Sequence, residues 1–187
     1  GDLGLASTPD STSVRGANLL ARWRREQGEA QWQVQAYYDQ TERAAPPGGV
    51  AFVLRTWDLD LQRRLRPRGR HAILLGAGYR LNRYAITNST ALAFEPPRRA
   101  LGFGNLSVQD VITLGRDLQL SAALKLEQDP YGGWTALPAL RLSWQPEDAN
   151  LLWAGVSRGV RAATPFDVDV VERLNGQVFL RGNPQFR

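Results

Sequence analysis

Few side chains in this sequence could catalyse a reaction or bind a metal. It contains one histidine, His71, and no cysteine, which excludes thiolate zinc sites, disulfides and cysteine nucleophiles. A metal site would need carboxylates beside His71, and Asp58 and Asp60 are the nearest acidic pair in the strand before it. A Ser-His-acid triad would also need His71, but no serine lies in a nucleophile motif. We therefore predict no catalytic residue, no metal site and no cofactor. We expect His71 to lie on a water-facing strand face or in a turn.

The run Gly76-Ala77-Gly78 could be mistaken for a phosphate-binding loop. It lies inside a predicted strand and no helix follows it, whereas phosphate loops lead into a helix N-terminus. We interpret these glycines as making room for a bulge or for a neighbouring side chain.

The chain is basic, with a formal net charge of +5, and Lys125 is its single lysine. Its arginines are spread along the sequence, with small clusters at 22–25 and 63–70. No recognition helix, stacking motif or zinc module accompanies them, so we predict no nucleic-acid partner. The arginines are interpreted as solvated turn charges and as charges that face the inside of a barrel.

The stretch from 118 to 127 shows which elements position these polar groups. Apolar and polar side chains alternate along it, which places one set on each face of a β-strand. The apolar set is Leu118, Leu120, Ala122, Leu124 and Leu126, and the polar set is Gln119, Ser121, Lys125 and Glu127. One face of this strand is therefore apolar and the other is polar.

The same alternation recurs along the chain and predicts an all-β, antiparallel up-and-down meander of about eight strands in one domain, 1–187. Loop is expected over 1–15, and the region 159–187 is expected to be loop-rich. The predicted strands are 17–25, 31–39, 52–62, 71–80, 105–114, 118–127, 137–144 and 151–158.

The connections between these strands alternate in length. Short turns are expected at 26–30, 64–70, 115–116 and 145–149, and long loops at 41–49, 81–104 and 128–135. Barrels of the bacterial outer membrane keep short turns on the periplasmic end and long loops on the external end. This pattern favours a transmembrane β-barrel, whose strands need only about 9–11 residues each to cross the bilayer.

Aromatic residues gather at the predicted strand ends. Trp23, Trp32, Trp144 and Trp153 flank short turns, and a second group lies towards the long loops: Tyr37, Tyr38, Trp57, Tyr79 and Trp134. Indole and phenol rings favour the membrane interface, so we interpret the groups as two aromatic girdles. The alternative is a soluble β-sandwich or lipocalin-like barrel, because alternation alone does not show whether the apolar face meets lipid or a protein core.

Several short motifs carry a resemblance to a known family. They are Gln35-Ala-Tyr-Tyr-Asp-Gln40, Val108-Gln-Asp110, Ser157-Arg-Gly-Val-Arg-Ala-Ala-Thr-Pro-Phe-Asp167 and Phe179-Leu-Arg-Gly-Asn-Pro-Gln-Phe186. Together they resemble the barrel of a TonB-dependent outer-membrane receptor, over nearly the whole chain. Thr164-Pro165 departs from the commoner order of that motif, in which Pro comes first.

The resemblance implies a barrel of about 22 strands with an internal plug domain and a segment that binds TonB. Such receptors import scarce nutrients, such as ferric siderophores, with energy from the inner membrane. It therefore implies outer-membrane lipid, the plug, TonB and a ferric siderophore or similar ligand as partners, and the outer membrane of a Gram-negative bacterium as the location. We expect the chain to be a fragment from the middle of such a barrel.

Two groups of residues are candidates for contact with plug or ligand. Those predicted to face the lumen or plug are Arg22, Arg24, Gln33, Gln35, Asp58, Asp60, Gln62, Lys125, Glu127 and Arg141. Those predicted to bind ligand from external loops are Tyr84, Phe94, Arg98, Arg99, Tyr131 and Trp134. Arginine and aromatic rings suit an anionic iron chelate, because they offer charge-assisted hydrogen bonds and stacking. The lumen residues could instead merely solvate the interior and pair with one another.

The sequence thus predicts part of an energised outer-membrane transporter that is not an enzyme. The alternative function is a self-contained β-barrel module that binds a small apolar ligand. A hydrolase in a small outer-membrane barrel is a third possibility and would depend on His71.

Overall fold

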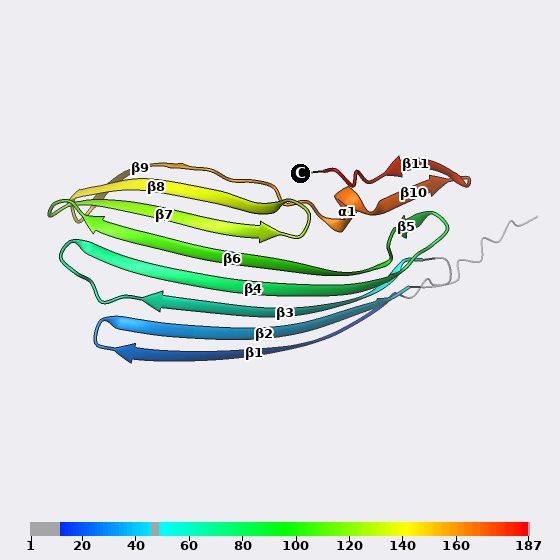
Figure 1. The fold of residues 1–187 in the computed structure, drawn as a ribbon, viewed down its shortest axis with the longest axis horizontal. Helices are drawn as coiled ribbons and strands as arrows, with labels where there is room; N and C mark the ends of the chain where they lie inside the picture. The colour runs from blue at the N-terminus through cyan, green and yellow to red at the C-terminus, as the bar shows by residue number, and fades with distance from the viewer. Residues whose placement is uncertain (1–11, 46–48, 187) are drawn as a thin grey trace, which may run out of the picture.

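A computed structural model describes residues 12–45 and 49–186 of the chain. Eight strands form one antiparallel sheet in the order β1-β2-β3-β4-β6-β7-β8-β9, and a small second sheet has the order β11-β10-β5 (Figure 1). The elements are β1 Ser13–Gln27, β2 Ala30–Ala44, β3 Ala51–Arg64, β4 His71–Thr87, β5 Leu92–Phe94, β6 Arg98–Thr113, β7 Leu118–Asp129, β8 Gly133–Glu147, β9 Asn150–Ser157, α1 Pro165–Val168, β10 Val170–Leu174 and β11 Gln177–Arg181. The predicted up-and-down meander is confirmed.

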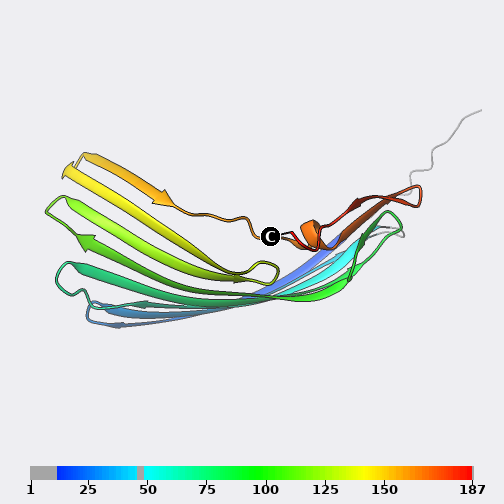
Figure 2. The same ribbon diagram turned by 45° about the horizontal axis from the view of Figure 1, so that its top comes forward.

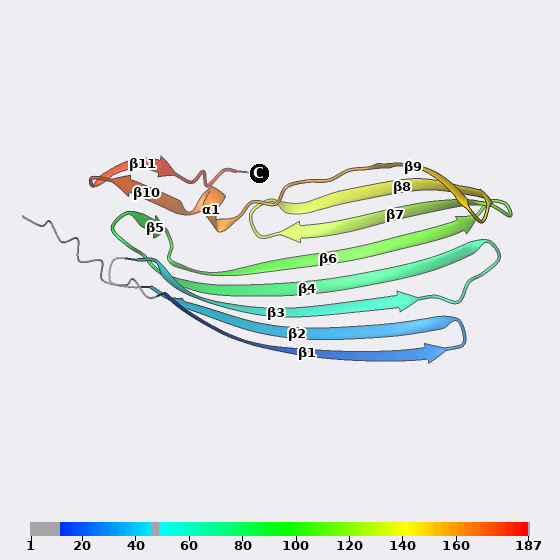
Figure 3. The ribbon, with the colours of Figure 1, turned by 180° about the vertical axis from the view of Figure 1, so that it is seen from behind.

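The large sheet is a curved wall (Figure 2). Its outermost strands are β1 and β9, which do not pair with each other, so the sheet is not closed within the described ranges. The turns β1–β2, β3–β4, β6–β7 and β8–β9 lie at one end, here called the turn end (Figure 1). The opposite end, called the loop end, carries β5, α1, β10 and β11 (Figure 3).

The loop predicted over 81–104 is wrong in most of its length. β4 continues to Thr87 and β6 already begins at Arg98, and the two strands stay in register from Ala85↔Arg98 onwards. These extensions lack the alternation of apolar and polar residues, so the period of two residues did not predict them. Backbone pairing alone is enough to extend a strand there, because each amide must find a partner.

The loop predicted over 128–135 is also wrong, since β7 and β8 are joined by a tight turn. The Asp129 carboxylate accepts hydrogen bonds from the backbone N–H groups of Tyr131 and Gly132, both at 2.8 Å. Gly133 follows with a positive φ of 76°. An aspartate that caps its own turn closes the hairpin within a few residues.

The region 159–187 is more structured than predicted. Thr164 and Asp167 form a capping box at the start of α1, which satisfies backbone donors at the helix N-terminus. Asn175 and Gly176 have φ values of 52° and 79°, the left-handed pair that a two-residue hairpin turn needs between β10 and β11. At the other end of the chain, Ser13 to Arg15 belongs to β1 rather than to the predicted loop, and residues 1–11 lie outside the described ranges.

The strand register gathers the apolar side chains on one face of the large sheet. Leu124 lies beside Val108 and Pro138, and Val108 lies beside Leu75. This apolar face is bare: Leu19 is 69% exposed and Leu140 is 50% exposed. Bare leucines along a whole sheet face are unusual for a protein surface in water and are expected for one that meets lipid.

Most but not all residues of the two predicted aromatic girdles share the apolar face. Trp23, Trp32 and Trp144 lie on the apolar face near the turn end, and Tyr38, Trp57, Tyr79 and Trp134 lie on it nearer the loop end. Trp153 instead pairs with Ser143 on the polar face, where the Arg141 guanidinium lies 4.6 Å from its ring. Tyr37 also points to the polar face, beside Asp58.

A small protein-like core lies at the loop end. The buried residues of the described ranges are all found there: Tyr84, Ala93, Leu101, Ala163, Val168, Asp169, Val170 and Val171. No helix in the described part of the chain is long and apolar enough to cross a membrane.

Candidate functional site: the polar face and the loop end

The polar face of the large sheet carries all of the residues predicted to face the lumen. The register puts Arg22 beside Gln35 and Gln35 beside Asp60, in one row across three strands. A second row runs through Arg24, Gln33 and Gln62. Across the sheet, Asp58, Lys125, Glu127 and Arg141 have the same orientation.

These polar side chains largely pair with one another. Arg22 donates two hydrogen bonds to Gln35 Oε1, at 2.9 and 2.7 Å. Arg80 forms an ion pair with Asp58 at 2.8 Å, and Lys125 forms one with Glu127 at 2.9 Å. Whether any of them also meets a plug or a ligand stays a prediction.

A polar hollow of about 490 Å³ opens on this face. It is lined by polar residues from β2 to β7, among them Gln33, Gln35, Asp58, Asp60, Gln62, Arg80, Asn105, Lys125 and Glu127. Gly78 lines it, and Gly76 lies two residues before Gly78 on the same strand face. A Cβ at Gly78 would lie 2.6 Å from Asn105 Nδ2, and one at Gly76 would collide with Ser107 Oγ. The glycines make room for neighbouring side chains, as the sequence predicted.

An apolar hollow of about 430 Å³ lies on the same face towards the loop end. Its lining from the sheet is Phe52, Leu54, Tyr84, Ile86, Leu101 and Phe103, and it is completed by residues 162–165. The alternating pattern did not predict it, because Tyr84, Ile86, Leu101 and Phe103 lie in the strand extensions and residues 162–165 come from a distant segment. The neighbouring hollow shares Asn82 and Phe103 with it, so polar and apolar surfaces adjoin.

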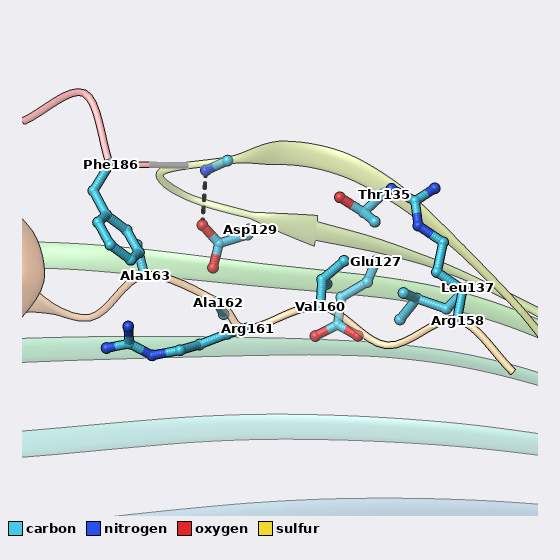
Figure 4. A pocket seen from close by; sticks show the side chains of 11 residues that line it. Glu127, Asp129, Thr135, Leu137, Arg158, Val160, Arg161, Ala162, Ala163 and Phe186 are labelled. Atoms are coloured by element: carbon cyan, nitrogen blue, oxygen red, sulfur yellow. Dashed lines mark hydrogen bonds between the residues drawn. The ribbon is translucent and has the colours of Figure 1, made fainter.

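A third hollow, of about 520 Å³, lies between the β7–β8 hairpin and the segment after β9 (Figure 4). Glu127 and Asp129 line it together with Arg158, Arg161 and Phe186. The Arg161 guanidinium lies 5.2 Å from the Phe186 ring. Both arginines belong to the motif 157–167 that carries the family resemblance, and neither is among the ligand-binding residues predicted from the sequence.

The buried carboxylate of Asp169, only 3% exposed, holds the loop end together. Arg99 Nη2 donates to its Oδ1 at 2.7 Å, and the hydroxyls of Tyr84 and Tyr131 donate to its Oδ2 at 3.2 and 3.3 Å. We call these four residues the Asp169 node. Its members come from β4, from β6, from the β7–β8 turn and from the residue after α1, so it ties four separate segments together.

The node also perturbs the phenol of Tyr131, which lies in the turn beyond the sheet. Burial raises the pKa of Tyr131, and the Asp169 carboxylate raises it further. Burial disfavours the charged phenolate form, and the negative charge of the Asp169 carboxylate repels a phenolate beside it. Tyr131 therefore stays protonated and continues to donate its hydrogen bond.

The six predicted ligand-binding residues fall into three groups. Tyr84, Arg99 and Tyr131 point into the node, so their polar groups are occupied within the protein. Phe94 packs edge-on against Phe166, with ring centroids 6.5 Å apart. Arg98 and Trp134 are exposed, and both have the orientation of the apolar face. The structure thus brings three of the six residues together, around a carboxylate that the sequence reading did not single out.

His71 lies on the apolar face near the turn end. Its Nδ1 is 2.6 Å from Asp110 Oδ2, whereas Asp58 and Asp60, the acidic pair nearest in sequence, lie on the polar face. No group of three or more potential metal ligands occurs among the described residues. His71 therefore has one acidic neighbour, from β6.

Comparison with known proteins agrees with this architecture. The family model described as "TonB dependent receptor-like, beta-barrel" matches residues 2–187. The chain belongs to the TonB-dependent receptor family. Among solved structures, the siderophore receptor PirA from Pseudomonas aeruginosa superposes on 89% of this chain with a TM-score of 0.69 and 17% identity. No curated protein matches the chain.

The receptor chain spans 37% of the length of the PirA structure that it matches. An identity of 17% supports a common fold, and ligand specificity is not transferred at that level. The TonB-dependent receptor family is one of outer-membrane proteins, which fits the bare apolar face of the sheet.

Proposed function

We propose that the chain is part of a receptor in the outer membrane of a Gram-negative bacterium that imports a scarce nutrient such as a ferric siderophore. Transport would draw energy from the inner membrane through TonB and would involve a plug domain inside the barrel. The observation that carries the proposal is one sheet with a bare apolar face and a continuous polar face, matched over its length by the receptor-barrel family.

The polar face suits the lining of a passage. Some of its charged groups are neutralised within the face, in the pairs of Arg80 with Asp58 and of Lys125 with Glu127. A plug could exchange these contacts for its own at small cost, because exposed ion pairs contribute little each. We assign this face to the plug and to the ligand's path.

The loop end suits a ligand with both aromatic and anionic parts. Phe52, Leu101 and Phe103 offer an apolar wall. Arg158 lies in the adjacent hollow and can donate charge-assisted hydrogen bonds to carboxylate or catecholate oxygens, and Arg161, whose guanidinium already pairs with Asp167, adds positive charge there. The two hollows share Ala162 and Ala163, so one ligand can bridge both. We assign ligand contact to this region in place of Tyr84, Arg99 and Tyr131.

We assign no catalytic role to any residue. The self-contained module for a small apolar ligand is the weaker hypothesis. Such a module needs its apolar side chains around an enclosed cavity, whereas here they cover the outside of a sheet, with Leu19 69% exposed.

The test is iron uptake by the intact receptor in cells that lack their other iron receptors. Radioactive iron is supplied as a ferric catecholate and, separately, as a ferric hydroxamate. We expect Phe103→Ala to lower uptake of one of these chelates about tenfold or more, as expected for loss of an aromatic anchor. Phe179→Ala in β11 is the matched control, because Phe179 is 64% exposed. Failure of the wild-type receptor to support uptake of any iron chelate would contradict the proposal.

A further inference from the structure

The turn end of the large sheet carries an unusual concentration of arginine. Residues 24–31 and 63–70 form the two turns that join β1 to β2 and β3 to β4, together with the adjoining strand ends. They contain seven arginines and only two acidic residues, Glu26 and Glu29. None of these arginines forms an ion pair within the part of the chain that the structure describes.

Two of these arginines lie on the apolar face itself. The register aligns Arg25, Trp32 and Arg63 in one row across β1, β2 and β3. Adjacent strands are about 4.8 Å apart, so the two arginine backbones are about 10 Å apart with the indole between them. The next row towards the loop end is apolar, with Trp23, Val34 and Leu61. On β1 and β2 the charged row therefore lies at the turn-end edge of the apolar surface.

The guanidinium of Arg63 is already oriented by its neighbour. Its Cζ lies 4.2 Å from the centre of the Trp32 ring. A guanidinium stacked on an aromatic face still presents its N–H donors at its edge, in a fork that matches a phosphate. An arginine held in this way loses less conformational freedom when it binds an anion.

The turn beyond this row is ordered and adds further positive charge. Arg68 and His71 exchange two backbone hydrogen bonds, at 3.0 and 3.1 Å, with Gly69 between them at a positive φ of 61°. A Cβ at Gly28 would lie 3.4 Å from Arg66 Nη2, so the Arg66 side chain reaches over the β1–β2 turn. Arg66, Arg68 and Arg70 thus lie in the turn that directly follows the strand of Arg63.

We propose that Arg25, Trp32 and Arg63 form a binding site for the headgroup of an anionic phospholipid, reinforced by Arg66, Arg68 and Arg70. The phosphate would bridge the two guanidinium groups across the outer edge of the Trp32 indole, and the acyl chains would extend over Val34 and Leu61 on the apolar face. Charge complementarity identifies the occupant: unpaired arginines border a surface that only hydrocarbon can cover favourably. This inference rests on the proposed location of the receptor in a membrane.

The test uses the intact receptor in lipid nanodiscs of phosphatidylcholine with a minor fraction of phosphatidylglycerol. Retained phosphatidylglycerol is counted by native mass spectrometry after detergent release. The test variant is Arg25→Gln/Arg63→Gln. Its matched control is Arg24→Gln/Arg64→Gln, which removes the same charge from the adjacent residues, whose side chains point to the polar face.

We expect the test variant to retain roughly tenfold less phosphatidylglycerol than the wild type, since each arginine near an anionic surface contributes a several-fold preference. The control should retain wild-type amounts, and Arg25→Lys/Arg63→Lys should be intermediate because it keeps charge but loses stacking and the planar fork. The lysine variant also guards against misfolding of the glutamine variant.

Equal retention by the wild type and the test variant would overturn the inference. Equal loss in the test variant and the control would also overturn it, because bulk charge would then explain the binding. Displacement of the lipid by an acidic polyglutamate peptide at low concentration would indicate an acidic protein partner and would overturn it too. A receptor that enters no nanodisc would instead refute the proposed location, a result distinguishable by its absence from the discs.

Discussion

The large sheet and the loop end are stabilised in different ways. The sheet has paired backbones and exposed side chains, with leucines bare on one face and ion pairs on the other. The loop end has buried valines and a buried carboxylate that meets an arginine and two tyrosines. The apolar side chains of the large sheet are buried only by what surrounds the protein, whereas those of the loop end are buried by the protein itself.

This difference follows from what each region meets. Strands in a bilayer must pair every backbone group internally, and lipid covers their apolar face. Loops beyond the bilayer meet water, so they need a conventional core to hold a defined shape. The Asp169 node brings together segments up to 85 residues apart in sequence, which positions the walls of the hollows that we propose as the ligand site.

The largest expected effect comes from placing a charge on the apolar face. Leu124→Arg, near the middle of β7, should destabilise the folded receptor by about 2–4 kcal/mol in a bilayer, because the guanidinium would enter hydrocarbon. Urea unfolding from lipid vesicles measures this free energy. Ala123→Arg is the control, since its side chain shares the polar face with Gln109 and Ala139. An equal loss of unfolding free energy in the two variants would contradict the claim that one face meets lipid and the other meets water.

A somewhat smaller effect is expected at the loop end from Asp169→Ala. The variant leaves Arg99 and two tyrosine hydroxyls without their acceptor. It should lower the local stability of β10 by about 1.5–3 kcal/mol while leaving the large sheet unchanged. Hydrogen exchange of β10 amides compared with β7 amides separates the two regions, and Asp169→Asn should be milder. A uniform loss of protection across both would show that they are not separate.

The register of the sheet permits a double-mutant test on the polar face. In Gly78→Val the new Cβ would lie 2.6 Å from Asn105 Nδ2. The cost should be about 1 kcal/mol, the low end for overpacking, because Asn105 borders an open hollow and can turn away. Adding Asn105→Ala should recover most of this loss. Additive costs in the double variant would mean that the two residues do not face each other.

The smallest effect concerns the capping box of α1. The Thr164 hydroxyl, which donates to the Asp167 carboxylate, is the main cause that lowers the pKa of Asp167 below its ordinary value. The ionised Asp167 carboxylate therefore stabilises α1 fully at pH values above the ordinary carboxyl pKa. This stabilisation is lost as the pH falls through the lowered pKa of Asp167. Thr164→Val should move this acid transition to higher pH, as followed by hydrogen exchange of the amides of residues 166–168. An unchanged transition would contradict the role of the cap.

The sheet was predictable where lipid imposes a pattern. Between Leu118 and Glu127 each side chain must suit either oil or water, so alternation revealed both the strand and its faces. The same rule placed Arg22, Gln35 and Asp60 on one face before any register was known. Beyond the bilayer this requirement disappears, which is why the continuation of β4 to Thr87 was read as loop.

The node was not predictable, because nothing local links its members. Tyr84, Arg99 and Tyr131 were singled out as exposed ligand contacts, since arginines and aromatic residues in a loop suggest binding. Their partner Asp169 follows a short helix late in the chain and carried no signal of its own. The prediction for Trp153 was wrong for a simpler reason. A position beside a turn shows that a residue lies near the end of a strand, but it does not show to which face of the sheet the side chain points.

The most direct test of the account is a scan of single cysteines along β7 in the intact receptor, reconstituted in vesicles and freed of native thiols. The chain itself contains no cysteine, so each introduced thiol within it reports one position. Thiols at 119, 121, 123, 125 and 127 should react with a water-soluble maleimide, and thiols at 118, 120, 122, 124 and 126 should be protected by lipid. Uniform reactivity along the strand, or protection of the odd-numbered set, would contradict the assignment of one face to lipid and the other to water.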